Sequence, residues 1–316
     1  MITYHQLETF LAVARTGSLT KAARDLGAAQ PTVSLQLHAL RKFLGTTLFE
    51  RPGGRFQLTP AGEKLRHYAE ETLGNLRILQ QDTAALKGTL AGPFALGATF
   101  VISRYVLPAT LSRFREQFPA VDLQLHVDVP DPLFGRLFAN TLDVACYVGV
   151  DHPPGLTVES VRDERLVLFV SRRHPLARRR RVSPQDLSEQ ALIVPVTAAL
   201  REMMERKLRA VNVRPRPGAE GKHHDAIKHL VERGLGYSLL IESSVADDVA
   251  SGRLVELNLD APPISGQIVI AYPTRSITPP IVRSFVDFVC LALNPGGKAQ
   301  GQRRQRTPQA PTKGRR

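Results

Sequence analysis

The side chains best suited to bind another molecule through hydrogen bonds stand close together after residue 30. Pro31 lies where a helix would begin, since its missing N–H costs nothing at the first helical position. Apolar residues then recur at helical spacing and predict a buried side, made of Val33, Leu37, Leu40 and Leu44. The outer side is predicted to carry Thr32, Ser34, Leu35, Gln36 and His38. Hydroxyl and amide groups in this pattern can bond to base edges or phosphates, and a glutamine can pair with adenine through two bonds.

The flanking residues predict the elements that hold this helix. Two helices are predicted before this one, the first capped by Thr3 and the second by Ser18. A Gly-containing turn separates the second helix from the helix at Pro31. Apolar residues on both sides of the turn at Gly53 predict a hairpin, whose tip is flanked by Arg51 and Arg55. Such helices, followed by a basic hairpin, are typical of a winged helix-turn-helix that binds DNA. The alternative is a three-helix packing unit, whose outer face would be polar in any case.

Residues 60 to 87 predict one long helix with an apolar stripe. The stripe follows steps of three or four and consists of Leu65, Ala69, Leu73, Leu76, Leu79 or Gln80, Thr83 and Leu86. A stripe on a helix between two domains needs a partner, which is either a second copy of the helix or another part of the same chain. Gly88 and the Gly92-Pro93 pair predict a hinge after this helix.

From residue 93 to residue 293, strand and helix signals alternate, which predicts α/β units on parallel-rich sheets. This segment is nearly neutral, with 24 Lys and Arg against 22 Asp and Glu. Its role is therefore expected to be something other than holding nucleic acid.

Several residue groups in this segment do not complete a chemical site. His223, His224, Asp225 and His229 suggest a metal, but His223 and His224 would point in different directions on a helix and no second cluster completes the ligand set. No catalytic motif and no dinucleotide-binding loop is recognisable, so we expect neither enzyme activity nor a cofactor. The six arginines of residues 172–181 predict a solvated loop. Cys146 and Cys290 match no metal or disulfide spacing and are predicted to be buried thiols.

The net charge of +13 is concentrated at the C-terminal end. Residues 294–316 hold seven basic residues and no acidic one, and they predict a disordered tail that adds phosphate attraction or solubility. No apolar run reaches the ~18–20 residues of a membrane span, and the N-terminus lacks the basic region of a signal peptide. We expect a soluble, cytoplasmic protein.

The segments "AARDLGAAQPTVS", "LGTTLFER" and "LTPAG" resemble the N-terminal domain of LysR-type transcriptional regulators, and "LDVA", "HPLA" and "LVERGLGYSLL" resemble the co-inducer domain of that family. The resemblance implies an all-α winged helix-turn-helix domain over residues 1–59 and a linker helix over 60–88 that pairs with its copy. Over 93–293 it implies a two-lobed α/β effector domain, crossed twice by the chain, like type 2 periplasmic binding proteins. The sequence departs from the family pattern at Ala29, Leu35 and Arg41.

DNA contacts are assigned from this resemblance and from the outward face to Gln30, Pro31, Thr32, Ser34, Gln36, His38, Arg51 and Arg55. The resemblance places an effector between the two lobes, where loops lead from strands into helices. The effector contacts are assigned to Thr99, Phe100, Val101, Ser103 and Thr197. Helix N-termini facing one cleft favour an anion, so the prediction is a small carboxylate. The alternative is that these hydroxyls only cap their own helices.

The expected partners are double-stranded promoter DNA, the small-molecule effector, and further copies of the chain in a homodimer or homotetramer. RNA polymerase is a candidate partner as well. The rival hypothesis is a two-lobed ligand-binding protein or enzyme unrelated to transcription. The first sixty residues discriminate between them, because a solute-binding protein would carry a signal peptide there.

Overall fold

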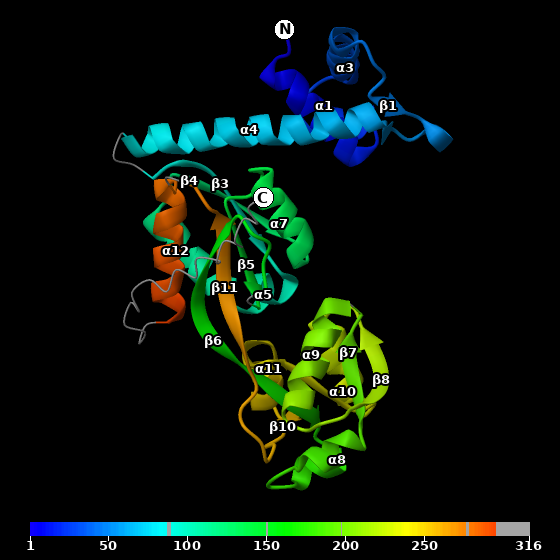
Figure 1. Ribbon diagram of the computed structural model, residues 1–316, viewed down its shortest axis with the longest axis vertical. Helices are drawn as coiled ribbons and strands as arrows, with labels where there is room; N and C mark the ends of the chain where they lie inside the picture. The colour runs from blue at the N-terminus through cyan, green and yellow to red at the C-terminus, as the bar shows by residue number, and fades with distance from the viewer. Residues whose placement is uncertain (87–89, 150, 197, 276–277, 295–316) are drawn as a thin grey trace, which may run out of the picture.

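A helical N-terminal domain, one long helix and two α/β lobes follow one another along the chain in the computed structural model (Figure 1). It describes residues 1–86, 90–149, 151–196, 198–275 and 278–294. The N-terminal elements are α1 (Tyr4–Thr16), α2 (Leu19–Asp25), α3 (Gln30–Leu44), β1 (Phe49–Glu50), the 3₁₀ turn η1 (Pro52–Gly54) and β2 (Gln57–Leu58). They form a winged helix-turn-helix, as the sequence predicts.

Helix caps and aromatic contacts fix this domain. Thr3 and the Gln6 side chain form the expected capping box at the start of α1, which ends at a left-handed glycine. Phe10 is fully buried and its ring centroid lies 5.2 Å from that of Phe49 on the wing, which joins α1 to the hairpin. One prediction for α3 is wrong: Leu44 is 37% exposed, because it lies in the last turn of the helix and joins none of the apolar clusters.

Helix α4 (Pro60–Leu86) does not present one apolar stripe but three separate faces. Leu65, Ala69 and Leu73 pack into the core of the winged domain. Gly74 and Gln81 are buried against the effector half of the same chain. The predicted stripe is therefore divided, and a third face, which includes Leu79 and Leu86, stays exposed.

The effector half has two lobes joined by two long strands. The crossing strands are β6 (Leu156–Ser171) and β11 (Ser265–Pro273). Lobe 1 contains β3 (Gly92–Ala98), α5 (Phe100–Tyr105), α6 (Leu107–Gln117), β4 (Val121–Val127), α7 (Pro130–Phe138), β5 (Val144–Val148) and α12 (Pro280–Leu293). Lobe 2 contains η2 (Pro175–Arg178), α8 (Pro184–Ser188), β7 (Ala191–Pro195), α9 (Ala198–Ala210), β8 (Arg216–Gly221), α10 (His224–Glu232), β9 (Tyr237–Ile241), α11 (Glu242–Ala250) and β10 (Leu254–Glu256).

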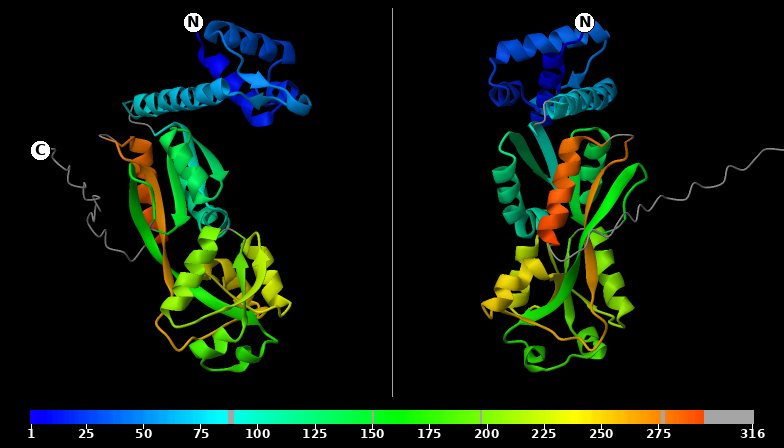
Figure 2. Two further views of the ribbon diagram at one scale, coloured as in Figure 1. Left: turned by 45° about the vertical axis from the view of Figure 1, so that its right-hand side comes forward. Right: turned by 90° about the vertical axis from the view of Figure 1, so that its left-hand side faces the viewer.

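The strand order is β4-β3-β5-β11-β6-β9-β7-β8, with β10 paired to β6. β3 pairs in parallel with β4 and β5, and β7 with β8 and β9, whereas β11 and β6 run antiparallel to each other from Leu156↔Pro273 to Arg165↔Ser265. Beyond Arg165, β6 leaves β11 and pairs with β9 in lobe 2. The chain thus crosses twice between lobes that lie at opposite ends of these strands, as predicted (Figure 2).

A buried carboxylate joins α4 to lobe 1. Asp143 is 5% exposed and accepts hydrogen bonds from the Arg77 guanidinium, from Gln81 Nε2 at 3.2 Å and from the Ala95 amide at 2.7 Å. Burial raises the pKa of Asp143, while the positive charge of Arg77 opposes the rise. The backbone also comes close here, since a Cβ on Gly74 would lie 2.5 Å from the carbonyl oxygen of Asn140.

We predict that Asp143→Ala lowers the free energy of unfolding by about 3–5 kcal/mol, because it leaves the Arg77 charge buried without its partner. Urea unfolding followed by circular dichroism measures the loss. The control is Glu63→Ala, whose carboxylate is 54% exposed and pairs with Arg66 on the surface, so its loss is about 1 kcal/mol or less. Equal small losses in both variants would show that Asp143 does not hold the junction.

Candidate DNA-binding and effector sites

Helix α3 lies at the outer end of the N-terminal domain, on the side away from α4 and the lobes (Figures 1 and 2). All but one of the side chains assigned to DNA on this helix are exposed: Gln30, Pro31, Thr32, Ser34 and His38. The N-cap residue, Ala29, has no side-chain acceptor for the first amides of the helix. Those amides are therefore available to a phosphate, which helix N-termini favour.

Gln36 is the exception on this face. It is half-buried, and its Oε1 accepts a hydrogen bond from the hydroxyl of Thr9 on α1, which is itself 1% exposed. Pairing with adenine through two bonds needs both Oε1 and Nε2 of a glutamine. The outward placement of Gln36 predicted from helical spacing is therefore wrong, because the crossing of α1 over α3 gives its carbonyl oxygen a partner inside the domain.

The wing carries both predicted arginines on its surface. The guanidinium of Arg51 lies over the ring of Phe56, 4.0 Å from the centroid, while Arg55 is exposed and has no ion pair in the part of the chain described here. Sequence reasoning missed two further cations, Lys21 and Arg24 on α2, which are exposed and unpaired there. In a helix-turn-helix, the helix before the recognition helix crosses the phosphate backbone. The feature of the sequence that could have identified them is their spacing of three, which places both cations on one side of a short helix.

Thr99 stands out among the residues assigned to the effector. It follows β3 directly as the N-cap residue of α5, yet its hydroxyl makes no capping bond to that helix. Thr99 Oγ1 is buried and has no hydrogen-bond partner within the described residues. An unsatisfied buried hydroxyl is costly, so a group that bonds to it would be stabilising there. The alternative that this hydroxyl merely caps its own helix is wrong.

The other described residues assigned to the effector already have partners within the protein. Ser103 Oγ donates to the carbonyl oxygen of Phe100 at 2.9 Å, so its hydroxyl is already satisfied within the helix. The Phe100 ring packs on His223 of lobe 2, with centroids 4.8 Å apart, and Val101 is half-buried against the main core. Thr197 lies outside the described residues.

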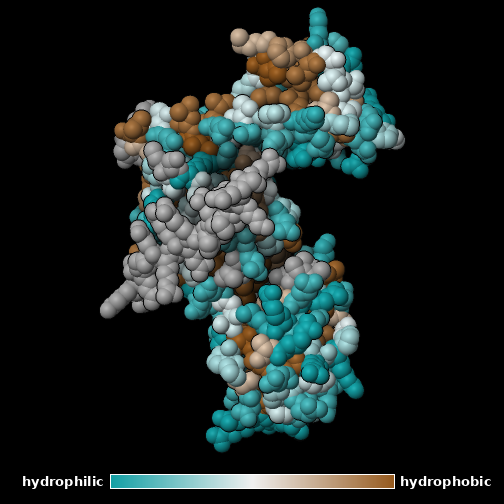
Figure 3. Space-filling view, viewed as in Figure 1, coloured by the Kyte–Doolittle hydropathy of each residue, from teal (hydrophilic) through white to brown (hydrophobic). Residues whose placement is uncertain are grey.

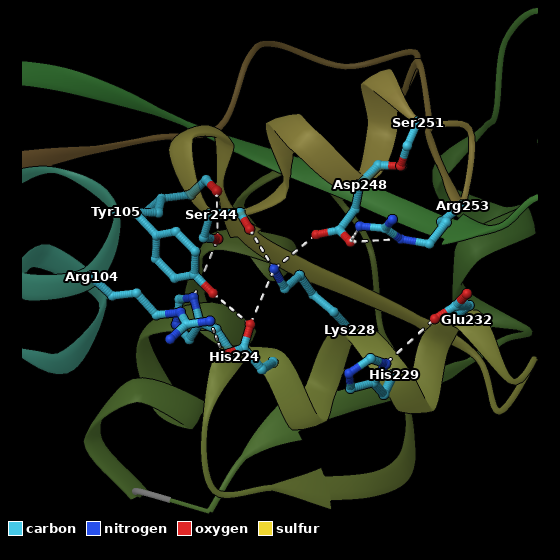
Figure 4. Close-up of polar contacts among 12 residues, drawn as sticks. Arg104, Tyr105, His224, Lys228, His229, Glu232, Ser244, Asp248, Ser251 and Arg253 are labelled. Carbon is cyan, nitrogen blue, oxygen red and sulfur yellow. Dashed lines mark hydrogen bonds and ion pairs between the residues drawn. The ribbon is translucent and has the colours of Figure 1, made fainter.

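A polar cluster joins α5 of lobe 1 to α10 and α11 of lobe 2 (Figure 4). The Tyr105 hydroxyl donates to Asp225 at 2.7 Å, and Arg104 pairs with the same carboxylate at 3.2 Å. Lys228 of α10 donates to Asp248 of α11 at 2.8 Å. Burial lowers the pKa of Lys228, but its bonds to Asp248 and Tyr105 outweigh burial and leave that pKa raised. The helix that begins beside Thr99 is thus also a bridge between the lobes.

The histidines near this cluster have separate environments. His224 Nδ1 lies 3.3 Å from Ser244 Oγ, and burial lowers the pKa of His224 to about 4, so the ring is neutral near pH 7. His229 is exposed and faces Glu232. Within the described residues, no three His, Cys, Asp or Glu side chains form a group that could hold a metal ion. The sequence patterns drew attention to these histidines as ligands but did not reveal two residues of the interlobe cluster. Tyr105 donates to Asp225 across the lobes, and the Lys228 ammonium of lobe 2 lies 5.1 Å from the centroid of the Tyr105 ring.

The arginine-rich segment predicted as a solvated loop includes the short helix η2 (Pro175–Arg178), and its six arginines are all exposed. Arg179 pairs with Asp186 and Arg181 with Asp260. Cys146 is buried, as predicted, and Cys290 is half-buried. The proposed basic tail, apart from Asn294, lies outside the described residues. Among the described helices, none is both long enough and apolar enough to cross a membrane.

Comparisons with known proteins agree with this architecture. Residues 4–63 match the family described as bacterial regulatory helix-turn-helix protein, lysR family, and residues 87–291 match the LysR substrate binding domain. The chain is 32% identical over 295 residues to the HTH-type transcriptional activator CmpR of Synechocystis, covering 91% of this chain and 94% of CmpR.

Two solved structures share the fold over almost the whole length. A full-length OxyR variant from Pseudomonas aeruginosa, in which one cysteine is replaced by aspartate, has a TM-score of 0.70 at 22% identity, covering 93% of this chain and 95% of that one. Full-length CbnR in complex with its target DNA has a TM-score of 0.67 at 24% identity, covering 91% and 98%. At these identities the likeness concerns the fold alone.

Because α3 is assigned to base contacts and the wing to phosphate contacts, mutations in the two elements should affect DNA binding differently. Ser34→Ala should weaken binding to the preferred sequence by about 1 kcal/mol and leave random DNA unaffected, because a base contact is lost. Arg55→Gln should weaken both kinds of DNA alike and reduce the slope of log K against log salt by about 1, because a phosphate contact is lost. Fluorescence anisotropy over a salt series measures both. An equal loss of affinity for random and preferred DNA in Ser34→Ala would contradict its assignment to base contacts.

Proposed function

The chain belongs to the LysR family of DNA-binding transcriptional regulators, and from that premise we propose that a small anion, such as a carboxylate, binds between its lobes and changes its binding to promoter DNA. The observation that carries the proposal is the buried, unpaired hydroxyl of Thr99. It lies directly after β3, and ligands of open α/β sheets bind where strands lead into helices. Because α5 also contacts lobe 2 through Tyr105, a ligand beside Thr99 would bear on the arrangement of the two lobes.

We propose that two copies of the chain pair through α4. An exposed stripe on this helix runs through Tyr68, Thr72, Leu76, Leu79, Thr83 and Leu86 in steps of four and three. Leu79 is 60% exposed and Leu86 is 88% exposed, and Figure 3 shows apolar atoms gathered on the C-terminal half of α4. This spacing is that of a coiled-coil seam, so a second α4 is the partner that it suits. A dimer would present two α3 helices to the two half-sites of a dyad.

A second surface supports assembly beyond the dimer. β4 is an edge strand of the sheet, and its Leu125 and Val127 are 41% and 47% exposed. An open hollow of about 510 Å³ lies beside it, lined in part by Leu111 and Leu123. Exposed apolar edges of this kind favour pairing with another chain, so we include a homotetramer in the proposal.

The proposal includes no enzymatic activity and places the protein in the cytoplasm, with RNA polymerase as a further candidate partner. A two-lobed binding protein or enzyme unrelated to transcription is a weaker candidate, because the exposed polar face of α3 and the basic wing would have no role in it.

The effector proposal predicts that Thr99→Val loses about 1–3 kcal/mol of affinity for the small anion while thermal stability is maintained or rises, since the hydroxyl has no partner to lose. A thermal-shift screen of small carboxylates and phosphates on the full chain identifies the ligand, and calorimetry measures its affinity. The control is Thr47→Val, which makes the same chemical change at an exposed position of the winged domain. Undiminished affinity in Thr99→Val would refute the site.

The assembly proposal predicts that Leu79→Glu dissociates the pair, because two carboxylates would be buried in the seam at a cost of several kcal/mol. Light scattering should change from the mass of a dimer to that of one chain. Gln80→Glu adds the same charge one residue along, outside the stripe, and should remain a dimer. Leu73 is unsuitable for this test, because its side chain packs inside the winged domain. A Leu79→Glu protein that keeps the wild-type mass would show that α4 pairs elsewhere or not at all.

A further inference from the structure

An apolar side chain stands in the middle of the outward face of α3. Leu35 is 70% exposed and belongs to none of the apolar clusters of the winged domain. Three of its exposed neighbours on this face carry hydrogen-bonding side chains: Thr32, Ser34 and His38. The other two, Pro31 and Ala39, are small and apolar. The interior of the domain therefore gains nothing from Leu35, and its side chain is free to contact whatever docks on this face of α3.

The position of Leu35 narrows what it can contact. It is the sixth residue of α3, in the N-terminal half of the helix, which is the part of a recognition helix that meets base edges in the major groove. Most groups on those edges are hydrogen-bond donors or acceptors, and an apolar side chain pressed against them would remove water without replacing its bonds. The C5-methyl group of thymine is the apolar group that the major groove offers.

We propose that Leu35 selects thymine in each half-site by packing on its methyl group. The inference rests on the proposed docking of α3 in the major groove and adds a specificity determinant to it. Ser34 supplies hydrogen-bonding capacity beside Leu35, so the two residues would distinguish bases by different chemistry. The recognised group is the methyl of a 5-methylpyrimidine. Uracil lacks only this methyl group, so comparing thymine with uracil at one position of the dyad isolates the contact.

The test begins with a duplex selected from random sequence by the full-length protein. Each thymine of one half-site and its symmetry mate is replaced in turn by deoxyuridine, which removes the methyl group and nothing else. At one thymine position, wild-type affinity should fall about fourfold for each half-site, the factor that corresponds to burying one methyl-sized group.

Leu35→Ala should bind the thymine duplex more weakly and should bind the thymine and uracil duplexes equally well. Its exposure means that the variant keeps its fold, which circular dichroism verifies. Phe43→Ala is the matched control, since it shortens another exposed apolar side chain of α3 that is not assigned to DNA, and it should retain the difference between thymine and uracil at that position.

The outcomes separate this inference from the function on which it rests. If the wild type selects a sequence but Leu35→Ala shows the same uracil losses as the wild type, Leu35 does not read a methyl group, although the DNA-binding function stands. If the wild type binds selectively and no uracil substitution weakens it, the inference is overturned in the same way. If no sequence is enriched at all, the docking of α3 fails and this inference fails with it.

Discussion

The buried carboxylate of Asp143 fixes how the two halves of the molecule are joined. It receives Arg77 and Gln81 from α4 and the Ala95 amide from β3, so one side chain ties the linker helix to the first strand of lobe 1. Breaking a buried ion pair by removing one partner is far more costly than losing a surface pair. The close approach of Gly74 to Asn140 adds a steric constraint at the same place, since a larger residue would force α4 outward.

The orientation of α4 determines which of its residues remain available. Because Gly74 and Gln81 face lobe 1, Leu79 and Leu86 are directed away from it and stay exposed. The N-terminal end of the helix is part of the winged-domain core through Leu65. The position of the winged domain, the exposed face of α4 and the attachment of lobe 1 are therefore connected through a single helix.

Lobe 2 is attached differently. The strands β6 and β11 carry the chain across, and among the described residues the polar and ring contacts between the lobes include the cluster around Asp225 and the packing of Phe100 on His223. Tyr105 and Arg104 both converge on that one carboxylate, only a few residues from the unpaired hydroxyl of Thr99. A ligand bonded to Thr99 and the bridge between the lobes would therefore share one short helix.

Local pattern was enough to predict the winged domain, the long helix and the α/β class of the second half, because caps, turns and apolar periodicity are properties of short segments. The division of that half into two lobes came from the resemblance to the LysR family. It failed where a residue has more than one available neighbour. Helical spacing placed Gln36 outward, but it could not show that Thr9, 27 positions earlier, meets its side chain. Periodicity found the apolar residues of α4 without showing that the winged domain covers Leu73 and leaves Leu79 exposed.

Long-range polar contacts could not be predicted from the sequence for the same reason. Arg77 and Asp143 are 66 positions apart, and Tyr105 and Asp225 are 120 apart, so neither pair leaves a local signature in the sequence. The unpaired state of the Thr99 hydroxyl likewise depends on the packing around it, although its place after a strand could be predicted.

The most direct test of the account is a genome-wide footprint of the full-length protein on the chromosome that encodes it. We expect a small number of protected sites, each with two related half-sites whose centres are about 34–36 Å, or a multiple of that distance, apart on one face of the duplex. The same assay with Leu79→Glu should lose the paired protection. Uniform coverage without dyad symmetry, or identical footprints from both proteins, would contradict the claim that paired α3 helices recognise promoter DNA.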